Sequence, residues 1–298
     1  MKILLFGKDG QVGWELQRSL APLGELVALG SKDRAPCGDL TDLTGITDTI
    51  NTLAPDVIVN AAAYTAVDRA EQEPELATQI NAEAPGIIAS VAERRNALLV
   101  HYSTDYVFDG SGQRAWQEDD SMDPSNVYGA SKAQGERAIT ASGCNHLIFR
   151  TSWVYAARGN NFLKTMLKLA RERESLNVID DQHGVPTGAE LIADVTAHAI
   201  RATRDNPALT STYHLAAAGT TSWFDYARLA ISFAREIGMS THVSDKDIHA
   251  ISTSDYPTPA ARPLNSRLNT EKLQTAFGLT LPGWEIGVQR AVTEILQT

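Results

Sequence analysis

The glycine-rich turn at the start of the chain constrains the fold more than any other feature of the sequence. Gly7, Gly10 and Gly13 follow a short apolar run, Ile3–Phe6, and lead directly into a stretch with helical periodicity, Gln11–Leu20. Glycines allow a tight turn and a close approach of the backbone to a ligand, and a new helix directs unpaired N–H groups at negative charge. The pattern is G-x-x-G-x-x-G rather than the common G-x-G-x-x-G, but its position between strand and helix favours dinucleotide binding. The alternative is a turn that serves chain geometry alone.

The first half of the chain alternates short apolar runs with longer amphipathic stretches. We expect strands at Ile3–Phe6, Leu26–Leu29, Val57–Val59, Leu98–Tyr102 and His146–Phe149, and helices at Gln11–Leu20, Leu43–Leu53, Glu75–Arg95 and Tyr128–Ala141. Strand–helix alternation implies right-handed crossovers and a parallel sheet covered on both faces. The sequence therefore predicts an α/β fold with a Rossmann-type, doubly wound parallel sheet.

The second half is less regular. Helical periodicity remains at 161–173, 189–201, 222–237 and 284–296, whereas the proline-rich segment 256–263 cannot form a regular helix or a central strand. We therefore expect a dinucleotide-binding domain at residues 1–155, with a return segment near 178–202, and a smaller, irregular substrate-binding lobe at 156–298. A ligand should lie in the crevice between them, at the carboxyl ends of the strands.

Charge and composition narrow the classes of partner and compartment. The chain of 298 residues carries 26 Lys and Arg against 36 Asp and Glu, a net charge of −10. This balance disfavours proteins that bind nucleic acid or adsorb to membranes through a basic face. The two cysteines, Cys37 and Cys144, are too few and too far apart for a disulfide scaffold or a Cys-based zinc site. With no secretory signal and no membrane-length apolar run in view, we expect a cytoplasmic protein.

The tip of the second strand bears on the choice of nicotinamide cofactor. An acidic side chain there would bind the adenosine ribose hydroxyls of NAD, but this chain has Gly30, followed closely by Lys32 and Arg34. We expect NADPH to be accepted at least as well as NADH, because no carboxylate at position 30 repels a 2′-phosphate. Alternatively, Lys32 and Arg34 are solvated loop charges.

Tyr128 and Lys132 stand four residues apart on an expected helix, so their side chains share one face. Reduction of a carbonyl needs a proton on oxygen, and a phenol with a reference pKa of about 10 needs help to supply it near neutrality. A neighbouring ammonium would lower the pKa of the phenol. An exposed tyrosine beside a solvated lysine is the alternative. The run Ser103-Thr104-Asp105 lies just past the fourth expected strand, where it serves either a ligand or a turn.

Together these motifs resemble the extended short-chain dehydrogenase/reductase superfamily, and within it the branch that reduces dTDP-activated keto-sugars. The resemblance extends over essentially the whole chain, and its most specific parts are Ser103–Phe108 and Arg262–Leu268. Further matches are Tyr128–Lys132, Asn60–Thr65, Phe149–Tyr155 and Gly184–Gly188. The resemblance implies reduction of the 4-keto group of dTDP-4-dehydro-β-L-rhamnose with NADPH or NADH, giving dTDP-L-rhamnose in the last step of its synthesis.

The resemblance also implies residue roles. Tyr128 would donate the proton to the C4 oxygen, Lys132 would lower the pKa of Tyr128 and hold the nicotinamide ribose, and Thr104 would bind the same oxygen. The implied substrate contacts are Thr104, Asp105, Trp153 and Arg262, with Trp153 over an apolar face of the sugar and Arg262 on the diphosphate. The implied cofactor contacts are Gly7, Gly10, Gln11, Val12, Gly13, Asp39, Leu40, Ala62, Ala63, Tyr64, Thr65, Tyr102, Tyr128 and Lys132.

Two implications of the resemblance concern assembly. Some members use Mg²⁺ near a subunit contact, and the matching positions are Glu15, Glu190 and Glu294, although three such glutamates can equally be helix-surface charges. A homodimer is the corresponding expectation.

Two of the implied substrate contacts also have structural alternatives. Trp153 could be a core aromatic, and Arg262 could be a surface ion-pair partner.

Two other functions stay open on the same fold. Dehydratases of this superfamily follow Thr-Asp with Glu, whereas Tyr106 follows Asp105 here, so their acid–base pair is incomplete. Epimerases and dehydratases also recycle bound NAD⁺ without net consumption. The second alternative is a non-catalytic, NADP-binding regulatory subunit, as in the resemblance to that of methionine adenosyltransferase.

Overall fold

The computed structural model describes residues 1–297 and contains a central sheet of six parallel strands. The strand order is β10-β5-β4-β3-β1-β2, and every neighbouring pair is parallel. The strands are β1 (Lys2–Phe6), β2 (Glu25–Leu29), β3 (Val57–Asn60), β4 (Leu98–Thr104), β5 (His146–Thr151) and β10 (Ser211–His214). The chain order reverses between β1 and β3, the position at which doubly wound sheets bind ligands. The predicted fold class is confirmed.

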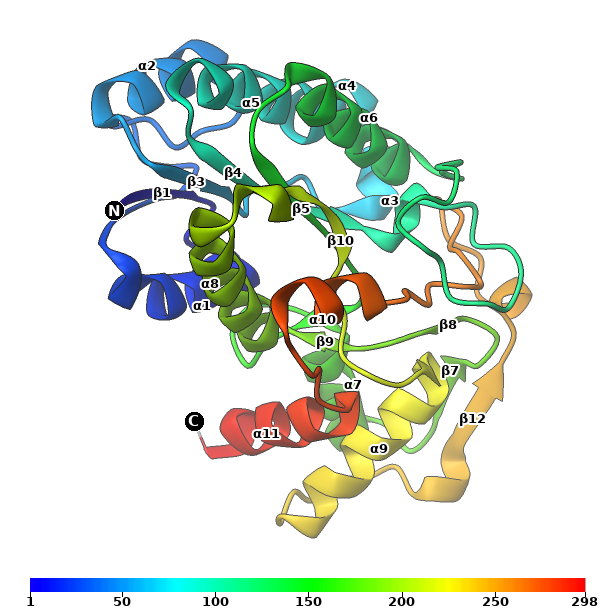
Figure 1. Ribbon diagram of the computed structural model, residues 1–298. Coiled ribbons are helices and arrows are strands. Elements are labelled where there is room, and N and C mark those ends of the chain that lie inside the picture. Colours follow the sequence, from blue (N-terminus) through cyan, green and yellow to red (C-terminus); the bar gives the residue numbers. More distant parts are fainter. Residues whose placement is uncertain (298) are drawn as a thin grey trace.

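Helices cover both faces of the sheet (Figure 1). One layer contains α2 (Leu43–Leu53), α5 (Ala84–Arg95) and α6 (Val127–Ser142), and the other contains α1 (Gln11–Leu20) and α8 (Ala189–Asp205). Each layer has its own apolar core against the sheet. Ile46 and Ile88 belong to the first core, and Leu16 and Ile192 to the second. Burial of both faces explains why the inner strands read as continuous apolar runs.

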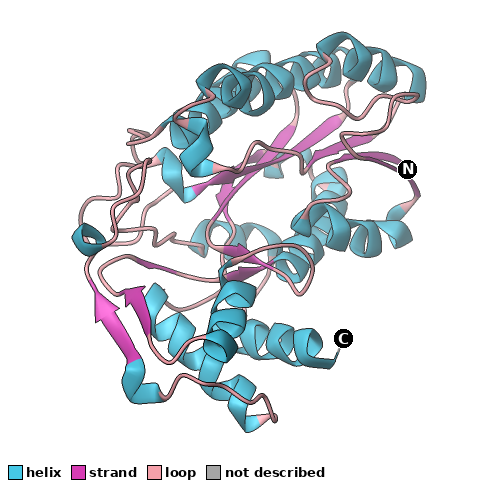
Figure 2. Cartoon of the chain, turned by 180° about the vertical axis from the view of Figure 1, so that it is seen from behind, coloured by secondary structure: helices cyan, strands magenta, loops and turns pink. Residues whose placement is uncertain are grey.

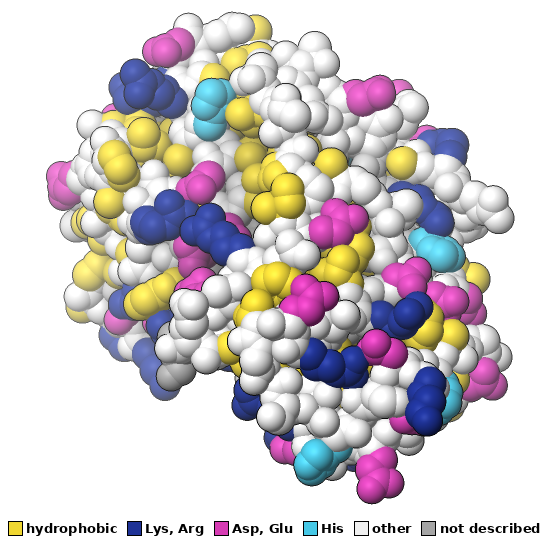
Figure 3. Space-filling view, turned by 90° about the horizontal axis from the view of Figure 1, so that it is seen from below, with side chains coloured by type: hydrophobic (Ala, Val, Ile, Leu, Met, Phe, Trp, Pro, Cys, Tyr) yellow, Lys and Arg dark blue, Asp and Glu magenta, His cyan; other side chains and the backbone are white. Residues whose placement is uncertain are grey.

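A second group of elements packs below the carboxyl ends of the strands, as seen from behind in Figure 2. Its helices are α7 (Phe162–Glu172), α9 (Trp223–Glu236) and α11 (Trp284–Gln297), which share a third apolar core. Short strand pairs complete it: β6 (Val154–Tyr155) with β9 (Thr187–Gly188), β8 (His183–Gly184) with β11 (Thr221–Ser222), and β7 (Leu176–Ile179) with β12 (Ile248–Ile251). On the face seen in Figure 3, cationic and anionic side chains are interspersed.

The remaining elements are short. They are α3 (Val67–Ala70), α4 (Pro74–Thr78), α10 (Glu271–Phe277), a π-helical turn η2 (Gln79–Glu83), and the 3-10 turns η1 (Ala21–Leu23), η3 (Asp105–Val107), η4 (Pro207–Leu209), η5 (Asp245–Asp247) and η6 (Thr253–Asp255). The stretch expected as one helix over 75–95 is therefore α4, η2 and α5 in succession. The proline-rich segment 256–263 contains no regular helix or strand, as predicted.

The chain returns to the sheet over a longer stretch than the segment expected near 178–202. Helix α8 packs on α1, and β10 then pairs with β5 as an edge strand at residues 211–214. The four residues of β10, Ser-Thr-Tyr-His, contain no apolar run. An edge strand is held to its one neighbour by backbone hydrogen bonds, so its sequence need not be apolar. None of the helices between residues 1 and 297 is long and apolar enough to cross a membrane.

A buried ion pair joins α6 to β5. The Arg150 guanidinium donates to both carboxylate oxygens of Glu136, with its Nη2 2.7 Å from Oε2, and both side chains are nearly inaccessible. Arg150 also donates to the carbonyl oxygen of Glu118 at 3.0 Å. Two buried charges remain stable only when each satisfies the other. The pair therefore fixes α6 against the sheet.

Glu136→Gln should lower the free energy of unfolding by about 3–5 kcal/mol, because it leaves the Arg150 charge buried without its counter-ion. Urea denaturation followed by circular dichroism measures the change. The matched control is Glu25→Gln, which breaks an exposed pair with Lys2 and should cost at most about 1 kcal/mol. Equal effects of the two substitutions would contradict the assigned role of the buried pair.

Candidate active site

A cavity of about 760 Å³ lies at the carboxyl ends of β1 to β5, where the segments after each strand converge. Sixteen of the predicted site residues line it: Gly7, Gly10, Gln11, Val12, Asp39, Leu40, Ala62, Ala63, Tyr64, Thr65, Tyr102, Thr104, Asp105, Tyr128, Lys132 and Trp153. These residues are spread over nearly 150 positions of the chain. Parallel strands bring them together because their carboxyl ends meet at one edge of the sheet.

The glycine turn forms one end of the cavity. Gly7 has a φ of +87°, and a Cβ there would lie 2.5 Å from the backbone nitrogen of Ala62. A Cβ on Gly13 would lie 1.9 Å from the carbonyl oxygen of Gly7, so Gly13 lets α1 pack directly on the turn. Gly10 is the N-cap of α1, and no side chain caps this helix. The uncapped N–H groups and the glycine backbone fit a pyrophosphate.

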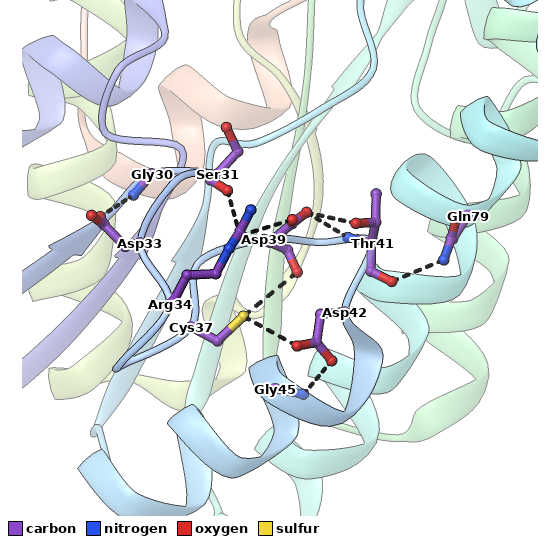
Figure 4. Close-up of polar contacts among 10 residues, drawn as sticks. All are labelled: Gly30, Ser31, Asp33, Arg34, Cys37, Asp39, Thr41, Asp42, Gly45 and Gln79. Carbon is purple, nitrogen blue, oxygen red and sulfur yellow. Dashed lines mark hydrogen bonds and ion pairs between the residues drawn. The ribbon is translucent and has the colours of Figure 1, made fainter.

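Polar contacts hold the loop after β2, at the outer end of the cavity (Figure 4). Asp33 accepts a hydrogen bond from the Gly30 backbone N–H and pairs with Lys8. The Arg34 guanidinium donates to the Ser31 carbonyl oxygen at 2.8 Å and to Asp39 Oδ2 at 2.9 Å. Gly30, Ser31 and Asp39 line the cavity, so Arg34 borders it through Asp39.

A carboxylate does lie beside the tip of β2, but it belongs to Asp9, in the glycine turn that follows β1. A Cβ on Gly30 would lie 2.1 Å from Asp9 Oδ2, so the Asp9 side chain from the glycine turn occupies the space beside Gly30. Asp9 also lines the cavity. An acidic residue was expected only at the tip of β2 itself. Asp9 was not predicted, because it reaches that tip from the end of β1 through a tertiary contact.

Tyr128 and Thr104 meet in the middle of the cavity. Helix α6 begins after Asn126, whose side chain accepts from the Gly129 N–H at 2.8 Å, so Tyr128 lies in the first turn. Thr104 ends β4, and its hydroxyl lies near enough to the phenol of Tyr128 to act on the pKa of that group. Burial raises the pKa of Tyr128 to about 12, Thr104 opposes that rise, and the charge of Asp105 adds to it.

Lys132 lies one helical turn further along α6 and lines the same cavity. Its Nζ donates to the Tyr102 carbonyl oxygen at 2.6 Å and lies 3.1 Å from His101 Nε2. Burial lowers the pKa of Lys132 to about 8, partly opposed by the charge of Glu136. Lys132 is not among the groups that act on the pKa of Tyr128 here, so its expected acidification of Tyr128 stays a prediction. Burial of the phenol dominates its pKa, and the amine is directed at Tyr102 and His101.

Asp105 places an unusual carboxyl group in the cavity wall. Its Oδ1 accepts from the Thr104 hydroxyl at 3.0 Å, whereas Oδ2 has no hydrogen-bond partner among residues 1–297. Burial raises the pKa of Asp105 to about 6, against the opposing effect of the Ser266 and Thr104 hydroxyls. Ser103 Oγ and Thr151 Oγ1, which also lie along the cavity, are unpartnered within the described chain. Buried polar atoms of this kind favour a polar ligand.

Stacked aromatic rings form the wall on the side of the C-terminal elements. Trp153 has a φ of +46°, rare for a bulky residue, and its ring stacks on Trp223 with centroids 3.7 Å apart. The Phe162 ring lies 4.5 Å from that of Trp223. Sequence reasoning found Trp153 but missed Trp223 and Phe162. Neither has a local motif, and Trp223 joins the wall from α9, seventy residues later in the chain.

Some predicted residues lie elsewhere. The Arg262 guanidinium pairs with Asp68 at 2.8 Å and does not line the cavity, as the ion-pair alternative anticipated. Gly13 lies beneath the turn rather than in the cavity wall. The charges of Glu15 and Glu294 act on the pKa of Glu190, yet no group of three His, Cys, Asp or Glu side chains between residues 1 and 297 is placed to hold a metal ion. The described residues of one chain therefore do not form the expected Mg²⁺ site by themselves.

Comparison with known proteins agrees with this geometry. The model of the RmlD substrate binding domain family matches residues 1–297. The dTDP-4-dehydrorhamnose reductases of Salmonella typhimurium and Escherichia coli are 57% and 55% identical over 298 residues, which is all of this chain and 99% of each relative. The crystal structure of dTDP-4-dehydrorhamnose reductase from Bacillus anthracis in complex with NADP has a TM-score of 0.87 at 34% identity, and covers 98% of this chain and 99% of its own. The chain therefore belongs to the RmlD substrate binding domain family.

Proposed function

We propose that the protein is an NADPH-dependent oxidoreductase that reduces the 4-keto group of dTDP-4-dehydro-β-L-rhamnose to give dTDP-L-rhamnose. The observation that carries this proposal is the meeting of Tyr128, Thr104 and Lys132 in a cavity that also contains an uncapped, glycine-lined helix N-terminus. The names of relatives more than half identical to this chain give the substrate class.

Tyr128 is the proton donor in this proposal. Its pKa of about 12 keeps the phenol protonated throughout the neutral range, which is the form that reduction of a ketone requires. Thr104 is placed to donate to the same substrate oxygen, because its hydroxyl lies near the phenol of Tyr128. Lys132 would hold the nicotinamide ribose. The dihydronicotinamide, when bound, supplies the hydride, and the residues of the chain supply orientation and the proton.

Asp105 and Trp153 are the proposed contacts for the sugar. Asp105 Oδ2 has an unused acceptor site for a sugar hydroxyl, and one face of the Trp153 ring is already covered by Trp223, which holds the ring in place. Arg262 could reach the diphosphate only after leaving Asp68, so its role as a clamp remains a prediction. Guanidinium groups exchange carboxylate for phosphate readily, since both accept paired hydrogen bonds.

The division into a dinucleotide-binding domain at 1–155 and a substrate-binding lobe at 156–298 is part of the proposal. Its support is that the glycine turn comes from the first segment and the Trp223 wall from the second. A cytoplasmic location is supported by Cys37 and Cys144, which are both free and buried, as is usual in a reducing compartment. The homodimer likewise remains a prediction.

The dehydratase alternative lacks support at one position. Elimination of water needs an acid beside Asp105, and the next side chain is the phenol of Tyr106, whose pKa is raised by burial. A regulatory protein, by contrast, could keep the same cavity without turnover. The two alternatives are separated from the reductase by whether NADPH is consumed in proportion to the keto-sugar.

Tyr128→Phe should reduce turnover with dTDP-4-dehydro-β-L-rhamnose by about 10²–10⁴-fold, since it removes the proton donor. NADPH oxidation measured by absorbance reports turnover, and calorimetric titration should show NADPH binding nearly unchanged. The control is Tyr213→Phe, because the Tyr213 hydroxyl donates to the Leu209 carbonyl oxygen away from the cavity. Absence of turnover in the wild type would instead favour the regulatory alternative.

Asp105→Asn should stabilise the fold at neutral pH while weakening the sugar contact. A folded-state pKa raised from 3.8 to about 6 means that ionised Asp105 costs up to about 3 kcal/mol above pH 6, at about 1.4 kcal/mol per pKa unit. That cost disappears as pH falls from about 6 to about 4, because both states then become protonated. Urea denaturation should show the variant's advantage narrowing over this range; an advantage that does not depend on pH would contradict the assigned pKa.

Arg34→Met should lower the preference for NADPH over NADH by about tenfold, the equivalent of about 1.4 kcal/mol in binding. The Arg34 guanidinium at the cavity edge is two-thirds exposed and can leave Asp39 for a 2′-phosphate, whereas Lys8 is half-buried in its pair with Asp33. The ratio of kcat/KM values for the two cofactors measures the effect. Lys32→Met is the matched control and should leave the ratio unchanged; a loss shared equally by both cofactors would exclude phosphate recognition by Arg34.

A further inference from the structure

The segment between β6 and α7 packs against the first turn of α1, at the glycine-lined end of the cavity. The Arg158 guanidinium lies over the Trp14 ring, 3.8 Å from its centroid. A Cβ on Gly159 would lie 3.2 Å from Gln11 Cγ, and Asn161 Nδ2 donates to Gln11 Oε1 at 2.8 Å. Gln11 and Asn161 both line the cavity. Their hydrogen bond therefore joins the glycine turn to the segment that leads into α7.

Two further hydrogen bonds fix the orientation of the Asn161 amide. Its Oδ1 accepts from the Lys164 backbone N–H at 3.0 Å and so caps α7, and its Nδ2 donates to the Ala156 carbonyl oxygen at 2.7 Å. A rotated amide would place its oxygen against that carbonyl and its NH₂ against the N–H, so both bonds would be lost. The nitrogen of Asn161 therefore faces Gln11, and the Gln11 amide must present its oxygen.

This arrangement leaves the amide nitrogen of Gln11 available to a ligand. Gln11 is the first residue of α1, beside the uncapped N–H groups, and its Nε2 has no acceptor among residues 1–297. The oxygens of a diphosphate accept hydrogen bonds, so this group needs donors around it. Because Oε1 is held by Asn161, Gln11 can offer a diphosphate its NH₂. The reverse orientation would set an oxygen against the phosphate oxygens.

Asn161 also precedes the helix that supplies part of the aromatic wall. The next residue, Phe162, begins α7, and its ring packs on Trp223, which stacks in turn on Trp153. The hydrogen bond from Asn161 to Gln11 therefore fixes the start of α7, and with it this wall, relative to the glycine turn.

We propose that Asn161 is a positioning residue for the dinucleotide: it holds the Gln11 side chain with its Nε2 donors free for the diphosphate of the cofactor. Asn161 acts through Gln11 and does not itself contact the cofactor. The diphosphate is then held by the glycine turn together with a residue from the segment 156–298. This inference rests on the cofactor site of the proposed function, but not on the reaction carried out there.

Asn161→Ser removes the donor to Gln11 and keeps a side-chain oxygen that can cap α7. The probes are 2′-phospho-ADP-ribose, which contains the diphosphate, and adenosine 2′-monophosphate, which lacks it. Competition with NADPH in calorimetric titrations measures both affinities without turnover. We expect the variant to bind the diphosphate probe about tenfold less tightly, the scale of one hydrogen bond to a charged group, and the monophosphate equally well. An unchanged affinity for the diphosphate probe, or an equal loss for both probes, would overturn the proposal.

Gln11→Met tests whether Asn161 acts through Gln11. Methionine keeps the length and helix propensity of glutamine but has no amide. This variant should also bind the diphosphate probe about tenfold less tightly. The double variant should show the same tenfold loss, because Asn161 then has no amide to orient. Losses that multiply to about 100-fold would indicate independent roles and contradict the proposal.

Arg158→Met is the matched control, because it removes another contact between the same segment and α1 and leaves the Gln11 amide in place. At an ionic strength of about 0.15 M, which screens distant charges, both probes should bind with unchanged affinity. A tenfold loss of the diphosphate probe in this control would assign the effect to attachment of the segment and refute the role of amide orientation.

Asn161→Asp provides the same test if the serine variant does not fold, since aspartate keeps both the shape and the helix cap. Its carboxylate can only accept, so the Gln11 amide must rotate and present its oxygen to the diphosphate. The diphosphate probe should bind at least about tenfold less tightly, with a smaller change for the monophosphate. Equal affinities of this variant and the wild type for the diphosphate probe would refute the proposal.

The reductase proposal and this inference can fail separately. Failure of the reductase proposal would appear as absence of turnover in a wild-type protein that binds both probes. Failure of this inference would appear as unchanged affinities for the diphosphate probe in variants of a fully active enzyme.

Discussion

The attachment of α6 to the sheet is the constraint on which the site depends. The helix carries Tyr128 and Lys132, and the buried Glu136–Arg150 pair and the Lys132–Tyr102 hydrogen bond fix it against β5 and β4. Gly135 allows the close approach on the other side, because a Cβ there would lie 2.1 Å from the Asn81 carbonyl oxygen. A small shift of α6 would separate the Tyr128 hydroxyl from Thr104, and positioned proton transfer tolerates little displacement.

Burial, more than pairwise attraction, sets the electrostatics of the cavity. The same loss of water raises the pKa of Tyr128 and Asp105 and lowers that of Lys132. Each shift favours the uncharged form, as desolvation requires. The result is a phenol that stays protonated at neutral pH, an amine with a pKa of about 8, and a carboxyl group with a pKa of about 6. Shifted pKa values of this kind are common at sites that act on ligands. The free energy lost by burying these groups is offset by packing elsewhere in the fold.

Much of this architecture could be predicted from the sequence, because strand–helix alternation and glycine turns are local signals. Helices α1 and α2 have the predicted bounds, and Gly7, Thr104, Tyr128 and Lys132 lie together as their positions after β1, after β4 and on α6 suggested. The features that could not be predicted from the sequence are those that depend on tertiary contacts. Strand β10 is polar and short, and Trp223 reaches Trp153 only when α9 packs beneath the sheet. The partners of Lys132 and Arg262 could not be predicted either, since a hydrogen bond or an ion pair depends on which side chains meet in space.

The most direct test of the account follows the hydride rather than the variants. NADPH deuterated at the transferred position of the nicotinamide is incubated with the enzyme and dTDP-4-dehydro-β-L-rhamnose, and the product is analysed by NMR and mass spectrometry. The account predicts one deuterium on C4 of dTDP-L-rhamnose for each NADPH oxidised. Deuterium at another carbon, or product formed without loss of NADPH, would contradict it.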